Sequence, residues 1–101
     1  MAPCSTFSLI KVYDTKPTVY HIDLYRLNDV SEIEYLDIFS DLTGVYIIEW
    51  ADKLGYLTPD ESLNIYLSYN EDINFRDITI EGKGPRYQLF EQEITKKFRV
   101  V

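Results

Sequence analysis

Apolar and polar residues alternate along the stretch 19–26. One side of an extended chain here carries Tyr20, Ile22 and Leu24, and the other carries His21, Asp23 and Tyr25. The first set suits a strand side that packs on a core. The second set places an imidazole, a carboxylate and a phenol in one row. This row is either the solvated side of an ordinary amphipathic strand or part of a functional site.

Two further strands are predicted around this one. Residues 6–13 alternate, and the turn 14–17 ends at Pro17, so a short link permits an antiparallel hairpin with 19–26. The stretch 44–50, with a near-continuous apolar run at 45–48, predicts a strand buried on both faces.

A helix is expected between the second and third strands. Asp29 and Glu32 have the spacing of a capping box, which predicts a helix that begins there and fades near Ser40. A connection of this length favours a right-handed parallel β-α-β unit. Glu49 then lies at the carboxyl end of its strand, where α/β sheets bind ligands, and Asp23 lies near the corresponding end of the neighbouring strand.

The second half of the chain predicts a hairpin followed by a helix. A short helix or turn at 51–57 is interrupted at Gly55. The expected elements after it are strands at 63–69 and 75–81, the latter with Ile78 and Ile80 inward, a connecting turn at 70–74, a turn at 82–85 and a final helix at 87–98.

Composition predicts one globular α/β domain spanning 1–101. The hydrophobic fraction of 46% and aromatic fraction of 15% can form a modest core. The net charge of −7 opposes non-specific binding to nucleic acid phosphates. We expect a cytoplasmic protein without a membrane span or signal peptide, and the single Cys4 fits a reducing compartment.

The Asp23 and Glu49 carboxylates are candidates for holding Mg²⁺ and orienting water in a nucleotide hydrolase. Alternatively, Glu49 points into solvent and Asp23 pairs with Arg26. His21 is a candidate general base, a ligand, or a hydrogen-bonded packing residue. A carboxylate hydrolase site of another class is a further possibility, and it requires a deep cleft.

Three segments carry a resemblance to a known family. HIDLYRL at 21–27, IIEWADKLG at 47–55 and Thr6-Phe7-Ser8-Leu9 resemble, in order and spacing, the signature stretches of the TsaE family. That family supplies the ATPase component of the bacterial system that makes threonylcarbamoyladenosine (t6A) on tRNA. The resemblance implies a P-loop NTPase-like, three-layer α/β fold with a mixed sheet, a C-terminal β-hairpin and a helix.

The resemblance also implies a role for each matching residue. Glu49 is similar to the Mg²⁺ ligand and Asp23 to the acidic residue needed for ATP turnover. The residues similar to supporting or nucleotide-binding positions are Thr6, His21, Arg26 and Trp50. The implied cofactors are ATP and Mg²⁺, and the implied partners are TsaB- and TsaD-type subunits, with tRNA approached only indirectly.

Two departures from the family pattern stand out. Cys4-Ser5-Thr6-Phe7 replaces Ser-Pro-Thr-Phe, and no G-x-x-x-x-G-K-[ST] occurs in the sequence. That loop supplies backbone amides and a lysine to the phosphates. We therefore expect an N-terminally truncated TsaE-like domain that lacks the Walker A strand-loop-helix and is inactive alone. The alternative is a non-catalytic remnant or docking module for the threonylcarbamoyl-transfer complex.

Overall fold

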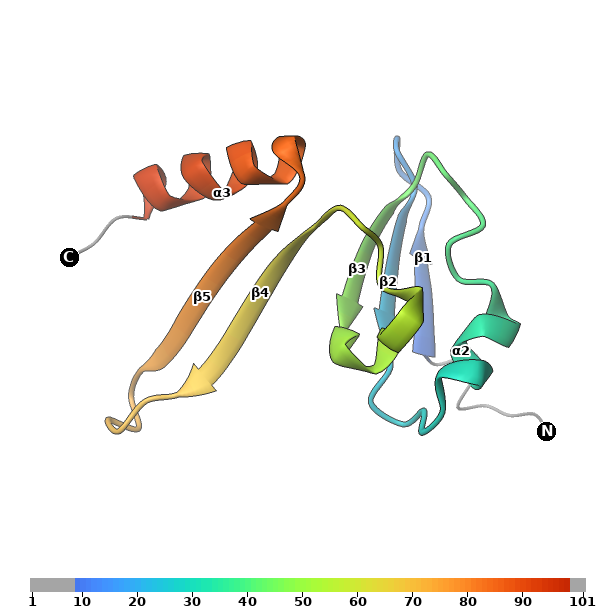
Figure 1. The fold of residues 1–101 in the computed structure, drawn as a ribbon, viewed down its shortest axis with the longest axis horizontal. Coiled ribbons are helices and arrows are strands. Elements are labelled where there is room, and N and C mark those ends of the chain that lie inside the picture. Colours follow the sequence, from blue (N-terminus) through green and yellow to red (C-terminus); the bar gives the residue numbers. More distant parts are fainter. Residues whose placement is uncertain (1–8, 99–101) are drawn as a thin grey trace. The chain divides into compact units, whose positions relative to one another are not determined.

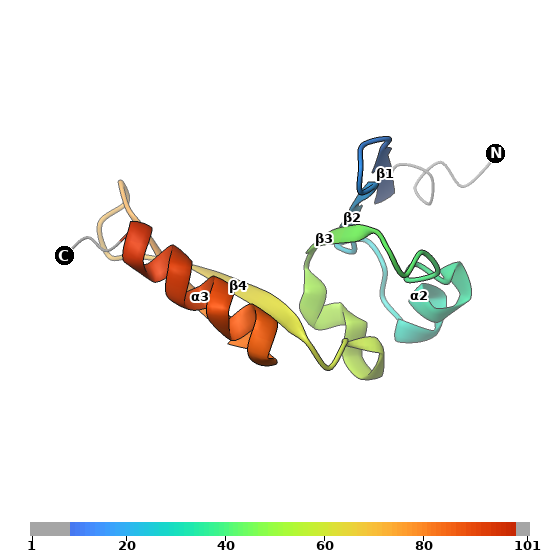
Figure 2. The same cartoon turned by 90° about the horizontal axis from the view of Figure 1, so that it is seen from above.

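The computed structural model describes residues 9–98, which form two compact units within Met1–Thr58 and Pro59–Val101. Each unit is described by itself. The α/β class expected from the sequence is confirmed: the first unit is a small sheet with helices, and the second is a hairpin with one helix (Figures 1 and 2).

The first unit contains a mixed three-stranded sheet. Its strands β1 (Ile10–Tyr13), β2 (Val19–Asp23) and β3 (Val45–Glu49) lie in that order. β1 and β2 are antiparallel, and β2 and β3 are parallel. The predicted hairpin and β-α-β unit are both confirmed. Of the first predicted strand, residues 6–8 lie outside the described residues.

The crossover helix α2 (Val30–Leu36) begins at the capping box that the sequence predicts. An Asp29 side-chain oxygen accepts from the Ser31 amide at 3.0 Å, and the Glu32 carboxylate accepts from the Asp29 amide at 3.3 Å. The helix is shorter than expected because Asp37 adopts a left-handed conformation, with φ 49°, and ends it.

The core of the first unit lies between the sheet and its helices. A short 3₁₀ segment, η1 (Ala51–Leu57), covers the sheet beside α2 and bends at Gly55, where φ is +54°. The buried core cluster consists of Ile22, Leu24, Ile33, Ile38 and Leu54. Ile22 and Leu24 come from the side of the 19–26 stretch that the alternation assigned to a core.

The prediction that the run 45–48 is buried on both faces is wrong. Val45 is 43% exposed and Ile47 is 53% exposed, whereas Tyr46 and Ile48 pack against the core. Among the described residues, β3 is an edge strand, and α2 and η1 pack on one face of the sheet. Within the described part of the first unit, no helix therefore packs on the face that carries Val45 and Ile47.

The second unit consists of a hairpin and the final helix. β4 (Ser62–Tyr69) and β5 (Arg76–Lys83) are antiparallel, and α3 (Pro85–Lys97) follows. The predicted turn at 82–85 is partly wrong, because β5 continues to Lys83. The helix begins earlier than predicted because Pro85 occupies its first turn, where a proline lacks no hydrogen bond.

The hairpin and α3 meet closely at one glycine. A Cβ on Gly82 would lie 2.0 Å from the Tyr87 carbonyl oxygen, and the Gly82 amide donates to the Glu91 carboxylate at 2.8 Å. Away from this contact the unit is open. The prediction that Ile78 points inward is wrong, since it is 60% exposed, and no described residue of α3 is buried.

Candidate functional site

The two candidate carboxylates lie on neighbouring parallel strands. Asp23 and Glu49 are register partners at the carboxyl ends of β2 and β3. The Tyr25 amide donates to Asp23 Oδ1 at 3.0 Å, and the Leu24 amide donates to the Glu49 carbonyl at 3.1 Å. Among residues 9–98, no ion pair joins Asp23 to Arg26. The alternative in which Arg26 neutralises Asp23 is therefore wrong.

His21 is the direct partner of Glu49. Its Nε2 lies 2.6 Å from Glu49 Oε2, with side-chain exposures of 33% and 54%. The two residues project from the same face of the sheet as Asp23, because alternate residues of a strand share a face. Of the three roles that the sequence left open for His21, this contact supports the hydrogen-bonded one and gives it a position beside the candidate metal ligand.

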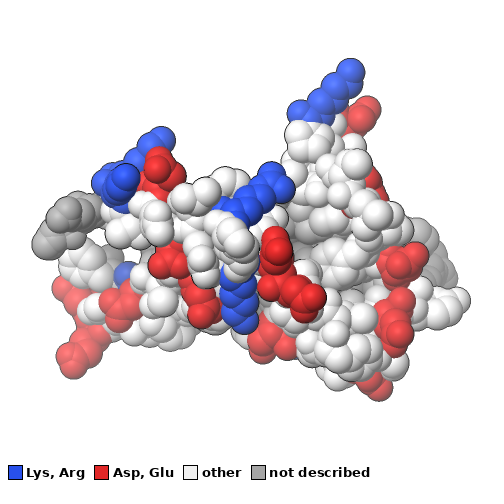
Figure 3. Space-filling view, turned by 45° about the horizontal axis from the view of Figure 1, so that its top comes forward, with Lys and Arg blue, Asp and Glu red and all other residues white. Residues whose placement is uncertain are grey.

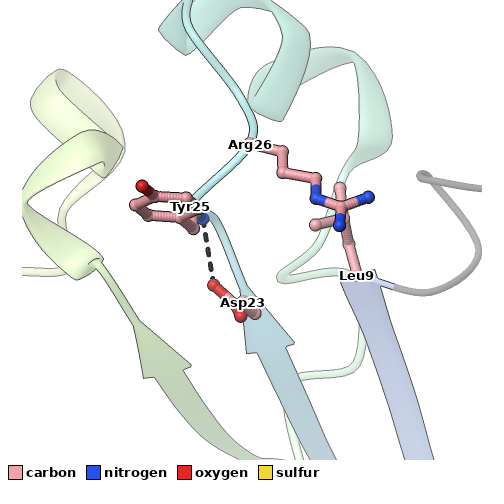
Figure 4. A pocket seen from close by; sticks show the side chains of 4 residues that line it. All are labelled: Leu9, Asp23, Tyr25 and Arg26. Carbon is pink, nitrogen blue, oxygen red and sulfur yellow. Dashed lines mark hydrogen bonds between the residues drawn. The ribbon is translucent and has the colours of Figure 1, made fainter.

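A shallow hollow adjoins Asp23. It has a volume of about 290 Å³ and is lined by Leu9, Asp23, Tyr25 and Arg26 (Figure 4). In Figure 4 the Arg26 side chain reaches across the hollow toward Leu9, while Asp23 bonds the Tyr25 amide. Ligand pockets begin at roughly 300 Å³. The hollow therefore gives no support to a deep-cleft carboxylate hydrolase, but a positive and a negative side chain face it.

Trp50 lies beside this hollow through its contact with Tyr25. Trp50 adopts a left-handed conformation, with φ 60° and ψ 43°, at the start of η1. Its ring centroid is 5.0 Å from that of Tyr25, at an interplanar angle of 50°. Both side chains are more than half exposed. The segments HIDLYRL and IIEWADKLG thus contact each other through Tyr25 and Trp50.

One residue of this region was missed by the sequence reasoning. Lys53 donates from Nζ to the carbonyls of Tyr25 and Leu27, the latter at 2.9 Å. No spacing in the sequence signals this contact, because the two partners are backbone atoms that become adjacent only after folding. Thr6, in contrast, was singled out but lies outside the described residues.

A second polar cluster connects β2 to the segment between α2 and β3. Tyr20 Oη donates to Asp41 Oδ2 at 2.6 Å, and the rings of Tyr20 and Tyr46 stack with centroids 4.8 Å apart. The hydrogen bond to Asp41 raises the pKa of Tyr20 to about 12. Hydrogen bonds from Tyr20 and Thr43 lower the pKa of Asp41 below its ordinary value. The cluster lies on the helix side of the sheet and takes no part in the hollow.

Acidic side chains predominate on the surface, with basic side chains among them, as Figure 3 shows for one face. Within the described ranges, no group of three or more His, Cys, Asp or Glu residues could hold a metal ion. Asp23 and Glu49 alone could therefore offer a cation no more than two carboxylates. No helix in residues 9–98 is long and apolar enough to cross a bilayer.

Comparison with known proteins agrees with the motifs. The model of the family described as threonylcarbamoyl adenosine biosynthesis protein TsaE matches residues 2–78. The chain belongs to the TsaE family. It is 36% identical over 92 residues to the tRNA threonylcarbamoyladenosine biosynthesis protein TsaE of Bacillus subtilis, a match that covers 90% of this chain and 58% of that protein.

Other TsaE proteins and a solved structure give the same result. The TsaE protein of Treponema pallidum is 35% identical over 79 residues, covering 74% of this chain and 56% of that protein. The crystal structure of Bacillus subtilis YdiB superposes with a TM-score of 0.69 at 31% identity, covering 89% of this chain and 57% of that one. The chain thus spans less than three fifths of the length of these TsaE relatives.

Proposed function

We propose that this chain is a TsaE-type component of t6A biosynthesis, in which Asp23 and Glu49 form the carboxylate pair of an ATP site. The observation that carries the proposal is their register pairing at the carboxyl ends of β2 and β3, within a chain of the TsaE family. The names of the relatives connect them to threonylcarbamoyladenosine on tRNA. The excess negative charge favours contact with tRNA through partner proteins, of the TsaB and TsaD types, rather than directly.

The donor atoms of the pair suit Mg²⁺. This ion prefers oxygen ligands and usually takes one or two carboxylates, with water and substrate phosphates completing its shell. His21 contacts Glu49 Oε2, which leaves Oε1 for a cation, and the Tyr25 amide holds Asp23 Oδ1. Bound there, Mg²⁺ would offset the charge of the phosphates and of the two carboxylates.

The chain's own residues have separate roles in this proposal. Glu49 ligates the cation and His21 fixes the orientation of its carboxylate. Asp23, on the adjacent strand, holds the water or the cation. Arg26 offers positive charge to a phosphate at the hollow. Trp50 and Tyr25 form an aromatic wall beside them. Thr6 is assigned to the phosphate end by its motif alone.

We expect the 101 residues to bind MgATP weakly and to release no measurable phosphate. The sequence has no G-x-x-x-x-G-K-[ST], so its residues lack the amides and lysine with which that loop binds β- and γ-phosphates. The arrangement therefore supports nucleotide contact more strongly than turnover.

Trp50 provides the test because it is the only tryptophan in the chain. We expect MgATP to quench Trp50 emission in the wild type. Glu49→Gln and Asp23→Asn should each raise the half-saturating concentration by about tenfold, which corresponds to the loss of one charged contact. Glu81→Gln, an exposed carboxylate on β5, is the matched control and should behave as wild type. Equal titrations for all four proteins would refute the assignment.

Exposed apolar surface favours a second candidate function, a docking module. Val45 and Ile47 are exposed in the first unit, and Ile65, Leu67 and Ile78 are exposed in the second. Such surface commonly marks protein contacts. This function predicts co-purification with TsaB- and TsaD-type subunits that Asp23→Ala and Glu49→Ala leave unchanged. Loss of binding in those two variants would refute docking as the sole function.

A further inference from the structure

Lys53 connects η1 to the segment that follows β2. Its ammonium donates to two backbone carbonyls, those of Tyr25 and Leu27, and lies 5.4 Å from the centroid of the Tyr25 ring. A lysine ammonium has three donors and no acceptor, so two carbonyls on one ammonium use most of its capacity. The two accepting carbonyls belong to the residues on either side of Arg26.

The segment 24–27 is held by the packing of Leu24 and Leu27 on the core and by the contact of the Tyr25 and Trp50 rings, but it has few other hydrogen bonds. The Leu24 amide bonds the Glu49 carbonyl and so extends the β2–β3 ladder. Beyond it, the Tyr25 amide bonds the Asp23 side chain, and the Leu27 amide bonds the Leu24 carbonyl at 3.1 Å in a local turn. Among the described residues, the hydrogen bonds from Lys53 are therefore the ones that join the backbone of residues 25–27 to a different element.

We propose that Lys53 is a positioning residue, which fixes the backbone on both sides of Arg26 and thereby directs Arg26 and Tyr25 to the hollow beside Asp23. This inference deepens the proposed function. It rests on that function for the reason why Arg26 and Tyr25 should be directed to the hollow. Lys53 itself does not line the hollow. It acts through the two carbonyls, and its removal frees the turn while the core cluster stays in place.

Amide hydrogen exchange measured by NMR on the full chain tests this proposal without any nucleotide. Lys53→Met retains the apolar stem and loses every donor. We expect the Tyr25 and Leu27 amides to exchange about tenfold faster in this variant, because charge-assisted hydrogen bonds limit local opening. The Leu24 amide serves as an internal reference and should be unchanged. Lys11→Met, on β1, is the matched control for losing one lysine.

Lys53→Arg supplies the rescue. A guanidinium also presents several donors, so exchange at Tyr25 and Leu27 should stay within about threefold of wild type. If Lys53→Met does not fold, Lys53→Gln, which is shorter and uncharged, replaces it with the same expected acceleration. Unchanged exchange at Tyr25 and Leu27 in a folded Met or Gln variant would overturn the proposal. Unchanged exchange would not bear on the proposed ATP site. Conversely, a chain that fails to bind MgATP would refute the ATP site and not the contact of Lys53 with the turn.

Discussion

Ile33 is the side chain through which α2 packs on the sheet, and its truncation should be costly. It is 1% exposed and belongs to the core cluster with Ile22, Leu24 and Leu54. Ile33→Ala removes three buried carbons, a transfer loss of roughly 2.4 kcal/mol at about 0.8 kcal/mol for each. A residual cavity adds to this, and the measured range for such truncations is about 2–5 kcal/mol. We expect a loss near 3 kcal/mol, because α2 is short and can partly collapse into the space.

Urea unfolding followed by Trp50 emission measures this loss within the first unit, which contains Trp50. With a slope near 1.5 kcal/mol per molar urea, the midpoint should fall by about 2 M. Tyr35→Ala is the matched control, since Tyr35 lies on the same helix and is 89% exposed. Its effect should stay within about 0.5 kcal/mol. If the two variants lose equal stability, α2 does not pack through Ile33 and the described core is wrong.

Three further predictions concern other parts of the chain. The free energy of unfolding should differ between the wild type and Tyr20→Phe by a constant amount at neutral pH, and this difference should vanish at both extremes of pH. It is lost at low pH, as the pH falls below 3.8, the ordinary pKa of an aspartate, and through the lowered pKa of Asp41. It is lost at high pH, as the pH rises from 10.0, the ordinary pKa of a tyrosine, through the raised pKa of Tyr20 near 12. A difference in the free energy of unfolding between the wild type and Tyr20→Phe that does not change with pH would refute this coupling. Gly82→Ala should detach α3 from β5, because its Cβ would meet a backbone carbonyl at 2.0 Å. The negative circular dichroism signal at 222 nm should then become weaker, and an unchanged spectrum would contradict the close approach. Because Val45 and Ile47 leave apolar surface exposed, we expect the chain to self-associate; Ile47→Lys should reduce this association in sedimentation velocity, whereas Leu42→Lys, at a residue that is 93% exposed, should not. A monomeric wild type that unfolds cooperatively at high temperature would contradict this expectation.

Local signals in the sequence predicted the first unit well. The alternation at 19–26 identified the buried side of β2, and Asp29 with Glu32 identified the start of α2. Both signals depend on residues only a few positions apart, so they can be recognised in the sequence alone. Burial of 45–48 was misjudged because an apolar run shows what a strand could bury and not which segments lie beside it.

The candidate site was predictable in part. The order of the strands places Asp23 beside Glu49, and the rule that ligands bind at carboxyl ends of parallel strands was enough to expect this. The contact of His21 with Glu49 was not foreseen, because it joins residues in diagonal rather than opposite positions. Lys53 gave no signal because it binds backbone atoms, which look alike at every position of a sequence.

Metal binding by the carboxylate pair tests the central claim most directly. Mn²⁺, which is visible by electron paramagnetic resonance and prefers the same oxygen ligands as Mg²⁺, can be titrated into the chain in the presence of ATP. We expect a bound fraction above that of ATP alone, which Glu49→Gln reduces at least about tenfold in affinity and Glu81→Gln leaves unchanged. Equal Mn²⁺ binding by the wild type and Glu49→Gln would contradict the assignment of Asp23 and Glu49 to an ATP site.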